Sequence, residues 1–196
     1  MAASESQTYR TLPARIVGWV ILVAVAGLAV VMGSVEAGLG NNPFSPAAFL
    51  AVVAAIVWVV LLRPAVRIEP GGVTMSNLVT DVTVPYERLG AVKHQWALEL
   101  VDNAGTKHSS WAIPVRRELR PRRDIDSYAE STTRRKAREG NNAEVIAGRV
   151  EKEWQRWRLA GGVEEPGRGV HRTWARGALV PLLGSVAFLL VILLVG

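Results

Sequence analysis

The sequence predicts a membrane protein of the α plus α+β class: three transmembrane helices and an antiparallel β-barrel or sheet closed by an amphipathic helix. Three observations predict this class. Three long stretches carry no charged residue, short runs of alternating apolar and polar residues follow the second stretch, and a later segment has apolar residues at helical spacing. The 196 residues have a mean hydropathy of +0.20 and a pI near 10.3, which indicates separate apolar and basic segments.

The first element is a polar tail at residues 1–15, followed by a charge-free run at residues 16–35. These 20 residues match the roughly 20 that a helix needs to cross about 30 Å of hydrocarbon, so they predict transmembrane helix 1. A cleaved signal peptide is the alternative, because basic residues precede the run. Signal peptides have shorter apolar regions of about 7–15 residues, which favours the transmembrane helix.

Residues 36–46 are rich in Gly, Asn and Pro and predict a short outer loop. Residues 47–62 form a second apolar run, extended by Phe44 and Ser45, and predict transmembrane helix 2. The first two spans therefore form a helical hairpin. A third uncharged run at residues 177–196 predicts transmembrane helix 3, after a polar linker at residues 161–176.

Residues 63–160 predict the β-rich domain, as a small, partly open barrel. Period-2 alternation and glycine-rich corners predict five strands, at residues 66–69, 72–75, 79–86, 96–100 and 107–113. We interpret Trp96 and Trp111 as core or rim aromatics of this sheet rather than as ligand-stacking residues.

A basic insertion at residues 115–140 interrupts the domain. Its five acidic residues are outnumbered by nine basic residues: Arg116, Arg117, Arg120, Arg122, Arg123, Arg134, Arg135, Lys136 and Arg138. These nine are candidates for binding anionic lipid headgroups, since each such residue near an anionic leaflet contributes on the order of 1 kcal/mol. The alternative is a solvated loop whose arginines act as topology signals.

Residues 142–160 predict an amphipathic helix. Ile146, Val150, Trp154 and Trp157 recur at spacings of four, four and three, which gives one apolar stripe. This stripe could pack on the open end of the barrel or lie in the membrane interface. The acidic residues of the segment favour packing, because anionic lipid would repel them.

All 23 Lys and Arg residues lie in residues 1–15, 63–158 or 168–176. With three spans, all of these segments fall on the same side of the membrane, and cytoplasmic loops are the ones enriched in Lys and Arg. We therefore expect a plasma-membrane protein whose N-terminus and β-rich domain are cytoplasmic and whose C-terminus lies outside the cell. Trp19, Trp58 and Trp174 fall toward the inner ends of the spans and are candidate membrane-interface anchors.

The composition argues against several function classes. The chain has no cysteine, its three histidines are spread apart, and its spans hold no ionisable residue. These features exclude thiol chemistry and argue against a metal site, a cofactor and a transport pathway. No nucleophile and base can be recognised by spacing. We expect no enzyme, and no nucleic-acid binding, since membrane topology accounts for the basic excess.

The segments RPAVRIEPGGVTMSN and TDVTVPYERLGAVKHQWALELVDNAGTKHSSWAIP resemble a known pattern. They are similar to the bacterial pleckstrin-homology (PH)-like domain of small actinobacterial membrane proteins, including the family named for low-molecular-weight protein antigen 6. The resemblance covers about residues 63–114 and implies a bent antiparallel sheet closed by a C-terminal helix. It implies no catalytic residue. The basic insertion and the third span are departures from the pattern.

These observations together favour a non-enzymatic membrane protein whose domain is a protein-binding adaptor or scaffold for an unidentified membrane or envelope protein. The alternative function is headgroup binding by the basic insertion.

Overall fold

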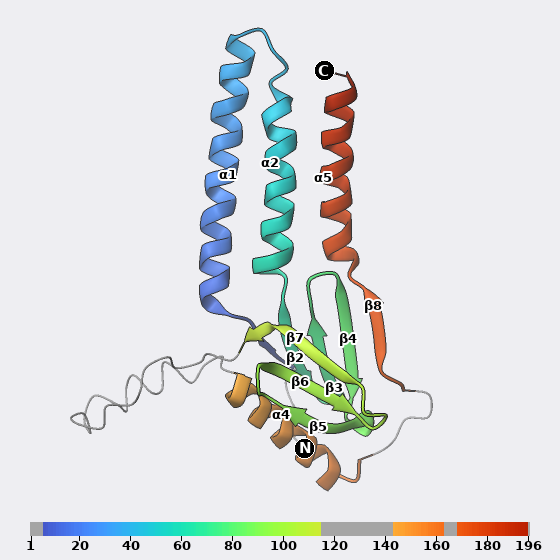
Figure 1. Cartoon of the computed structure of the whole chain (residues 1–196). Coiled ribbons are helices and arrows are strands. Elements are labelled where there is room, and N and C mark those ends of the chain that lie inside the picture. The colour runs from blue at the N-terminus through green and yellow to red at the C-terminus, as the bar shows by residue number, and fades with distance from the viewer. Residues whose placement is uncertain (1–5, 115–142, 163–167, 196) are drawn as a thin grey trace, which may run out of the picture. The chain divides into compact units, whose positions relative to one another are not determined.

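The computed structural model describes residues 6–114, 143–162 and 168–195. The chain divides into two compact units, and each is described by itself. The helical unit comprises Leu12–Pro64, Asn77–Asp81 and Thr173–Gly196, and the sheet unit comprises Met1–Thr11, Ala65–Ser76 and Val82–Arg172. Figure 1 labels their elements.

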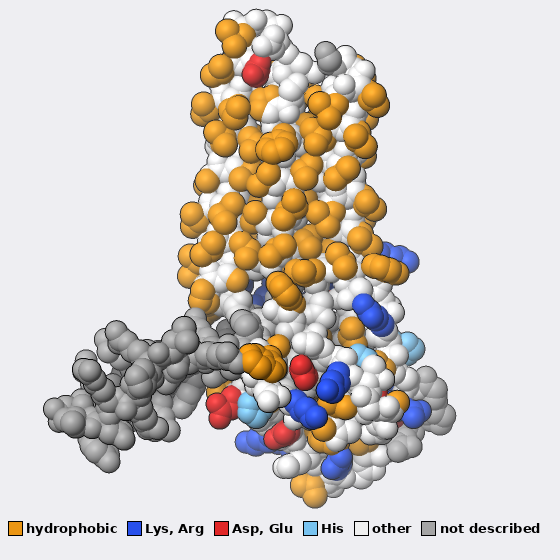
Figure 2. Space-filling view, in the orientation of Figure 1, with side chains coloured by type: hydrophobic (Ala, Val, Ile, Leu, Met, Phe, Trp, Pro, Cys, Tyr) orange, Lys and Arg blue, Asp and Glu red, His pale blue; other side chains and the backbone are white. Residues whose placement is uncertain are grey.

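The helical unit contains α1 (Leu12–Gly38), α2 (Phe44–Val57) with its wider-wound continuation η1 (Trp58–Leu62), and α5 (Arg176–Val195). Among the described residues, these three helices are long and apolar enough to cross a membrane, so the three predicted spans are confirmed at this level. Apolar side chains cover the face of these helices that Figure 2 shows. Such exposure suits lipid rather than water.

The first helix is longer than the charge-free run that predicted it. It begins at Leu12 and continues to Gly38, because the hydrogen bonds of a transmembrane helix can continue beyond the hydrocarbon region. Close packing explains one glycine within it: a Cβ at Gly18 would lie 2.9 Å from Leu62 Cδ2. The first helix and η1 therefore approach closely at this point.

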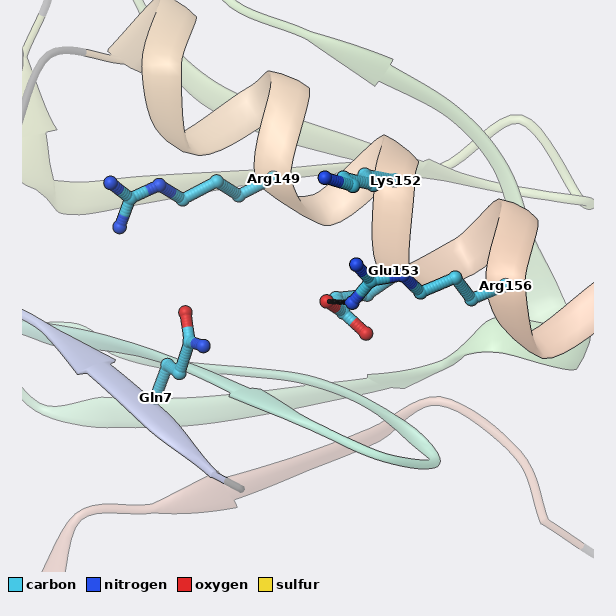
Figure 3. A pocket seen from close by; sticks show the side chains of 5 residues that line it. All are labelled: Gln7, Arg149, Lys152, Glu153 and Arg156. Atoms are coloured by element: carbon cyan, nitrogen blue, oxygen red, sulfur yellow. Dashed lines mark hydrogen bonds and ion pairs between the residues drawn. The ribbon is translucent and has the colours of Figure 1, made fainter. Parts of the chain in front are cut away.

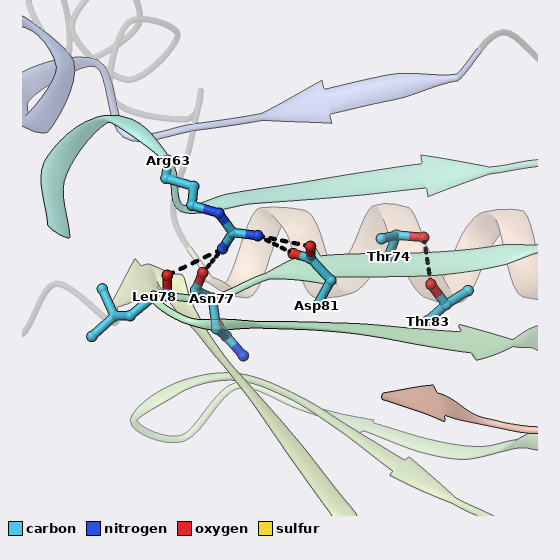
Figure 4. A network of polar contacts seen from close by, with 6 residues as sticks. All are labelled: Arg63, Thr74, Asn77, Leu78, Asp81 and Thr83. Atoms are coloured by element: carbon cyan, nitrogen blue, oxygen red, sulfur yellow. Dashed lines mark hydrogen bonds and ion pairs between the residues drawn. The ribbon is translucent and has the colours of Figure 1, made fainter. Parts of the chain in front are cut away.

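Arg63 ends the second span and holds the turn at residues 77–80 (Figure 4). Its Nη2 lies 2.7 Å from both carboxylate oxygens of Asp81, and its Nη1 donates to the carbonyl oxygens of Asn77 and Leu78. The Arg63 side chain is only 12% exposed, so water screens this fork-shaped contact weakly. One guanidinium thus fixes the end of the span to the turn.

The sheet topology differs from the expected barrel. One sheet has the order β1-β2-β3-β4-β8, and the other has the order β5-β6-β7. The strands are β1 (Gln7–Tyr9), β2 (Ala65–Glu69), β3 (Gly72–Ser76), β4 (Thr80–Pro85), β5 (Leu89–Lys93), β6 (Ala97–Asp102), β7 (Lys107–Pro114) and β8 (His171–Trp174). The strand β4 has β3 on one side and β8 on the other, so it has no free edge for β5. The chain passes through the short helix η2 (Tyr86–Arg88), and β5 then begins the second sheet. The strands form two sheets rather than the partly open barrel that was expected. The expected antiparallel pairing is confirmed for β1–β2, β2–β3, β5–β6 and β6–β7.

All five predicted strands are present, and three further strands were not predicted. The strand β1 lies in the expected polar tail, β8 lies in the expected linker, and β5 lies between two predicted strands. The domain therefore recruits short segments from both ends of the chain.

The helix α4 (Ala143–Leu159) packs on the core of the sheet unit. Ile146 and Val150 are fully buried, Trp154 is 9% exposed, and the Trp154 indole N–H donates to the Tyr86 carbonyl oxygen at 3.0 Å. The predicted packing of the apolar stripe is confirmed over the interfacial alternative. The fully buried side chains opposite it come from both sheets, and include Val84 and Leu100.

Of the two positions expected for Trp96 and Trp111, core or rim of the sheet, the core position is wrong, because each residue is 61% exposed. The pairing of β6 with β7 is irregular between Ala97 and Glu99. Ala112 and Ile113 take the buried positions of β7, which leaves Trp111 outside.

Candidate functional site

A polar pocket of about 370 Å³ lies between β1 and α4. We call it the α4–β1 pocket, and its lining residues are Gln7, Arg149, Lys152, Glu153 and Arg156. Figure 3 shows the Gln7 amide pointing from the strand toward the side chains of the helix. All five residues belong to the sheet unit.

The amphipathic pattern of α4 places the three cations of the pocket together. Arg149, Lys152 and Arg156 are spaced by three and four residues, so they share one side of the helix, next to the buried stripe. Sequence reasoning followed the apolar stripe and missed this basic one, although its spacing was visible. Gln7 could not be found, because the tail was not expected to form a strand.

Two contacts order the arginines of the pocket. The Arg149 Nη1 donates to the Tyr9 hydroxyl at 2.8 Å, and its guanidinium lies 5.1 Å from the centre of the Tyr9 ring. The Tyr9 hydroxyl donates in turn to Gln7 Oε1. Arg156 Nη1 lies 2.5 Å from Glu153 Oε1.

The charges lining the pocket do not balance. Of the described residues that line it, three are cations and one is a carboxylate, Glu153, which lies beside Arg156. Two positive charges are therefore in excess around an opening that an anion can enter. Arginine supplies a planar fork of N–H donors and lysine supplies a compact charge, which together suit an oxyanion.

A second candidate feature is the pair of exposed tryptophans on the three-stranded sheet. Trp96 directly precedes β6 and Trp111 lies within β7, the antiparallel neighbour of β6. Large exposed aromatic side chains on a sheet are typical of a protein-binding surface.

The third feature is an acid–base pair in the turn between β6 and β7. His108 Nε2 lies 3.2 Å from Asp102 Oδ2, and the side chains are 14% and 12% exposed. The backbone N–H of Thr106 donates to Asp102 Oδ1, and this bond, with that from His108, lowers the pKa of the Asp102 carboxyl. The backbone N–H of Ala104 donates to the same oxygen at 3.0 Å. The carboxylate thus closes the turn, which is a structural role.

The structure brings together only some of the residues that the sequence pointed to. His94, His108, Asp81 and Asp102 are the barrel residues that could converge into a polar site by sequence alone, and of these Asp102 meets His108, whereas Asp81 meets Arg63. Among residues 6–114, 143–162 and 168–195, no group of three or more His, Cys, Asp or Glu residues could hold a metal ion.

The predicted headgroup-binding residues all lie outside the described residues, since they belong to residues 115–140. The predicted interface anchors are described. Trp19 lies in α1, Trp58 begins η1, and Trp174 ends β8, with side chains 52%, 40% and 70% exposed. Their role as anchors stays a prediction.

Comparisons with protein-family models, with curated proteins and with solved structures give no significant match to this chain.

Proposed function

We propose that this chain is a non-enzymatic integral membrane protein whose sheet unit binds another membrane or envelope protein, as an adaptor or scaffold. The observation that carries the proposal is the exposure of Trp96 and Trp111, 61% each, on the three-stranded sheet. Tryptophan is enriched among residues that dominate binding energy at protein interfaces. Exposing two tryptophan side chains to water costs free energy, and a bound partner that covers them would remove this cost.

The connections to the spans support a membrane-held adaptor. Only Arg10 and Thr11 separate β1 from α1, only Arg63 and Pro64 separate η1 from β2, and only Ala175 separates β8 from α5. If the three helices span a bilayer, connections of one or two residues tether the sheet unit to it. The effective concentration of the domain near a membrane partner is then high without tight intrinsic binding.

Hydrogen bonding supports the expected topology. Gln7 pairs with Ile68 across β1 and β2, and the Ala175 N–H donates to the Val79 carbonyl oxygen. Paired backbone segments must lie on the same side of a bilayer, because a lipid-exposed sheet edge cannot cross hydrocarbon. With the Lys and Arg bias, this favours a cytoplasmic N-terminus and domain in the plasma membrane and a C-terminus outside.

A PH-like fold is part of the proposal. The sequence resemblance and the amphipathic helix packed on antiparallel strands support it. The division into two sheets is compatible with a bent, open sheet rather than a closed barrel.

The adaptor proposal is tested by photocrosslinking the full-length chain in its native membrane. A photoreactive amino acid replaces Trp96 or Trp111, and a control replaces Glu151, which is exposed on α4. We expect one discrete protein adduct from positions 96 and 111 and none from position 151. The adduct from position 96 should disappear when Trp111→Ala is added. Adducts with lipid alone, or the same protein adducts from all three positions, would contradict the proposal.

A further inference from the structure

We propose that the α4–β1 pocket is a binding site for a phosphate monoester dianion, which a phospholipid headgroup or a free phosphate compound could supply. The described residues that line the site include neither Trp96 nor Trp111, so the inference does not rest on the adaptor proposal. It rests on the charge, the donors and the volume of the pocket.

The charge of the pocket selects the class of ligand. The lining of three cations and one carboxylate leaves two positive charges. A phosphate monoester carries about −1.5 to −2 at pH 7, whereas a phosphodiester or a single carboxylate carries about −1. The dianion therefore neutralises the pocket, and the other two leave a positive charge.

The donors of the pocket are held for oxyanion binding before any ligand arrives. Tyr9 accepts one N–H of Arg149 and lies against its guanidinium, which fixes this arginine over β1. Glu153 holds Arg156 through one Nη. Because each guanidinium has five N–H donors, both arginines keep donors for a ligand. Fixed donors reduce the side-chain entropy lost on binding.

The lining and the size also fit a small polar ligand. The described residues that line the pocket are all polar or charged, which suits a polar ligand better than an apolar one. The Gln7 amide adds a neutral group opposite the helix, which can donate to a phosphate oxygen (Figure 3). A volume of about 370 Å³ accommodates a phosphate with a small substituent such as glycerol.

Lys152 is the residue to change first, because it takes no part in the contacts that hold Arg149 and Arg156. Lys152→Glu removes the excess charge of the pocket, and Lys152→Arg keeps it. The matched control is Lys107→Glu, the same change at an exposed residue of β7 that does not line the pocket. Equal melting temperatures would show that the variants are folded alike.

The first experiment measures binding of inorganic phosphate to the full-length protein in uncharged detergent at constant ionic strength, by ³¹P NMR. We expect the affinity to fall about tenfold or more in Lys152→Glu, since two unit charges are lost from the pocket, and to stay within about twofold in Lys152→Arg and Lys107→Glu. Deletion of residues 115–140 should leave phosphate binding in place.

The second experiment tests the lipid source. The protein is placed in phosphatidylcholine nanodiscs that contain a photoactivatable phosphatidic acid, and crosslinked peptides are mapped by mass spectrometry. Adducts on α4 that are lost in Lys152→Glu and kept in Lys107→Glu identify a lipid headgroup as the ligand. Phosphate binding without such adducts identifies a free phosphate compound. The proposal is overturned if neither probe binds, or if Lys107→Glu weakens binding as much as Lys152→Glu.

Discussion

Replacing Gly72 by alanine tests how closely β3 and β4 pack. A Cβ at Gly72 would lie 2.6 Å from the Val84 carbonyl oxygen and 2.8 Å from Pro85 Cα, both backbone atoms that cannot rotate away. Ordinary Cβ contacts begin at 3.4 Å, so the two strands would have to separate by about 0.8 Å. We therefore expect the substitution to disrupt the sheet at this point.

The cost follows from the bonds and side chains next to Gly72. The Tyr86 N–H donates to the Gly71 carbonyl oxygen at 3.1 Å, and a separation of this size breaks it, at about 0.5–1.5 kcal/mol. Overpacking beside the fully buried Val73 and Val84 adds about 1–3 kcal/mol. A total of about 1.5–4.5 kcal/mol lowers the melting temperature of a 60–100-residue domain by roughly 6 °C or more, since each kcal/mol shifts it by about 4–8 °C.

Thermal unfolding of the full-length protein in detergent, followed by tryptophan fluorescence, measures this effect. The matched control is Gly148→Ala on α4, where a Cβ meets nothing within 4 Å. Alanine in a helix interior stabilises by about 0.5–1 kcal/mol relative to glycine, so the control should melt higher than the wild type. A Gly72→Ala protein that melts within about 2 °C of the wild type, beside a stabilised control, would refute the packing argument.

Three further substitutions test other contacts. Tyr86→Phe should leave the free energy of unfolding unchanged or raise it by up to about 1 kcal/mol, because the buried Tyr86 hydroxyl has no hydrogen-bond partner in the described part of the chain. A clear loss of stability in thermal unfolding would contradict the absence of a partner. Asp102→Asn should lower the melting temperature at pH 7, and the difference from the wild type should vanish as the pH falls through the lowered pKa of Asp102, because the ionised carboxylate stabilises the fold and the protonated one does not. A difference in melting temperature that is the same at every pH would argue against a charge effect. Arg63→Lys should cost about 1–2 kcal/mol in the same assay, because lysine keeps the charge but its single nitrogen cannot serve Asp81 and the two carbonyl oxygens of the turn together. Adding Asp81→Asn should then cost little more, and fully additive losses would show that the two side chains act independently.

The elements with strong local patterns could be predicted, and their neighbours in space could not. The stripe of Ile146, Val150 and Trp154 defined α4 and its buried face, because helical periodicity over 17 residues is a strong signal. The strand β1 has only three residues and pairs with a strand some 60 positions away, so nothing local reveals it.

The same limit explains the site. The α4–β1 pocket needs Gln7 beside α4, and that neighbourhood depends on the undetected strand. Trp111 was expected to pack in or at the edge of the core because apolar alternation carries no information on the irregular register of β6 and β7. Spacing along one element thus predicted its faces, while the pairing of elements decided the topology and the pocket.

The pairing of β1 with β2 and the late position of β8 also constrain the order in which the chain can assemble. During synthesis β1 emerges first, yet its partner β2 follows only after two spans, so β1 must wait unpaired until the hairpin α1–α2 is inserted. The sheet is completed when β8 is made, immediately before α5. Completion of the sheet and insertion of the last span are therefore neighbouring steps. A chain that inserts only one of the two spans of the hairpin leaves β1 and β2 on opposite sides of the membrane. The first strand then stays unpaired, with an open edge that quality-control proteases or chaperones can recognise.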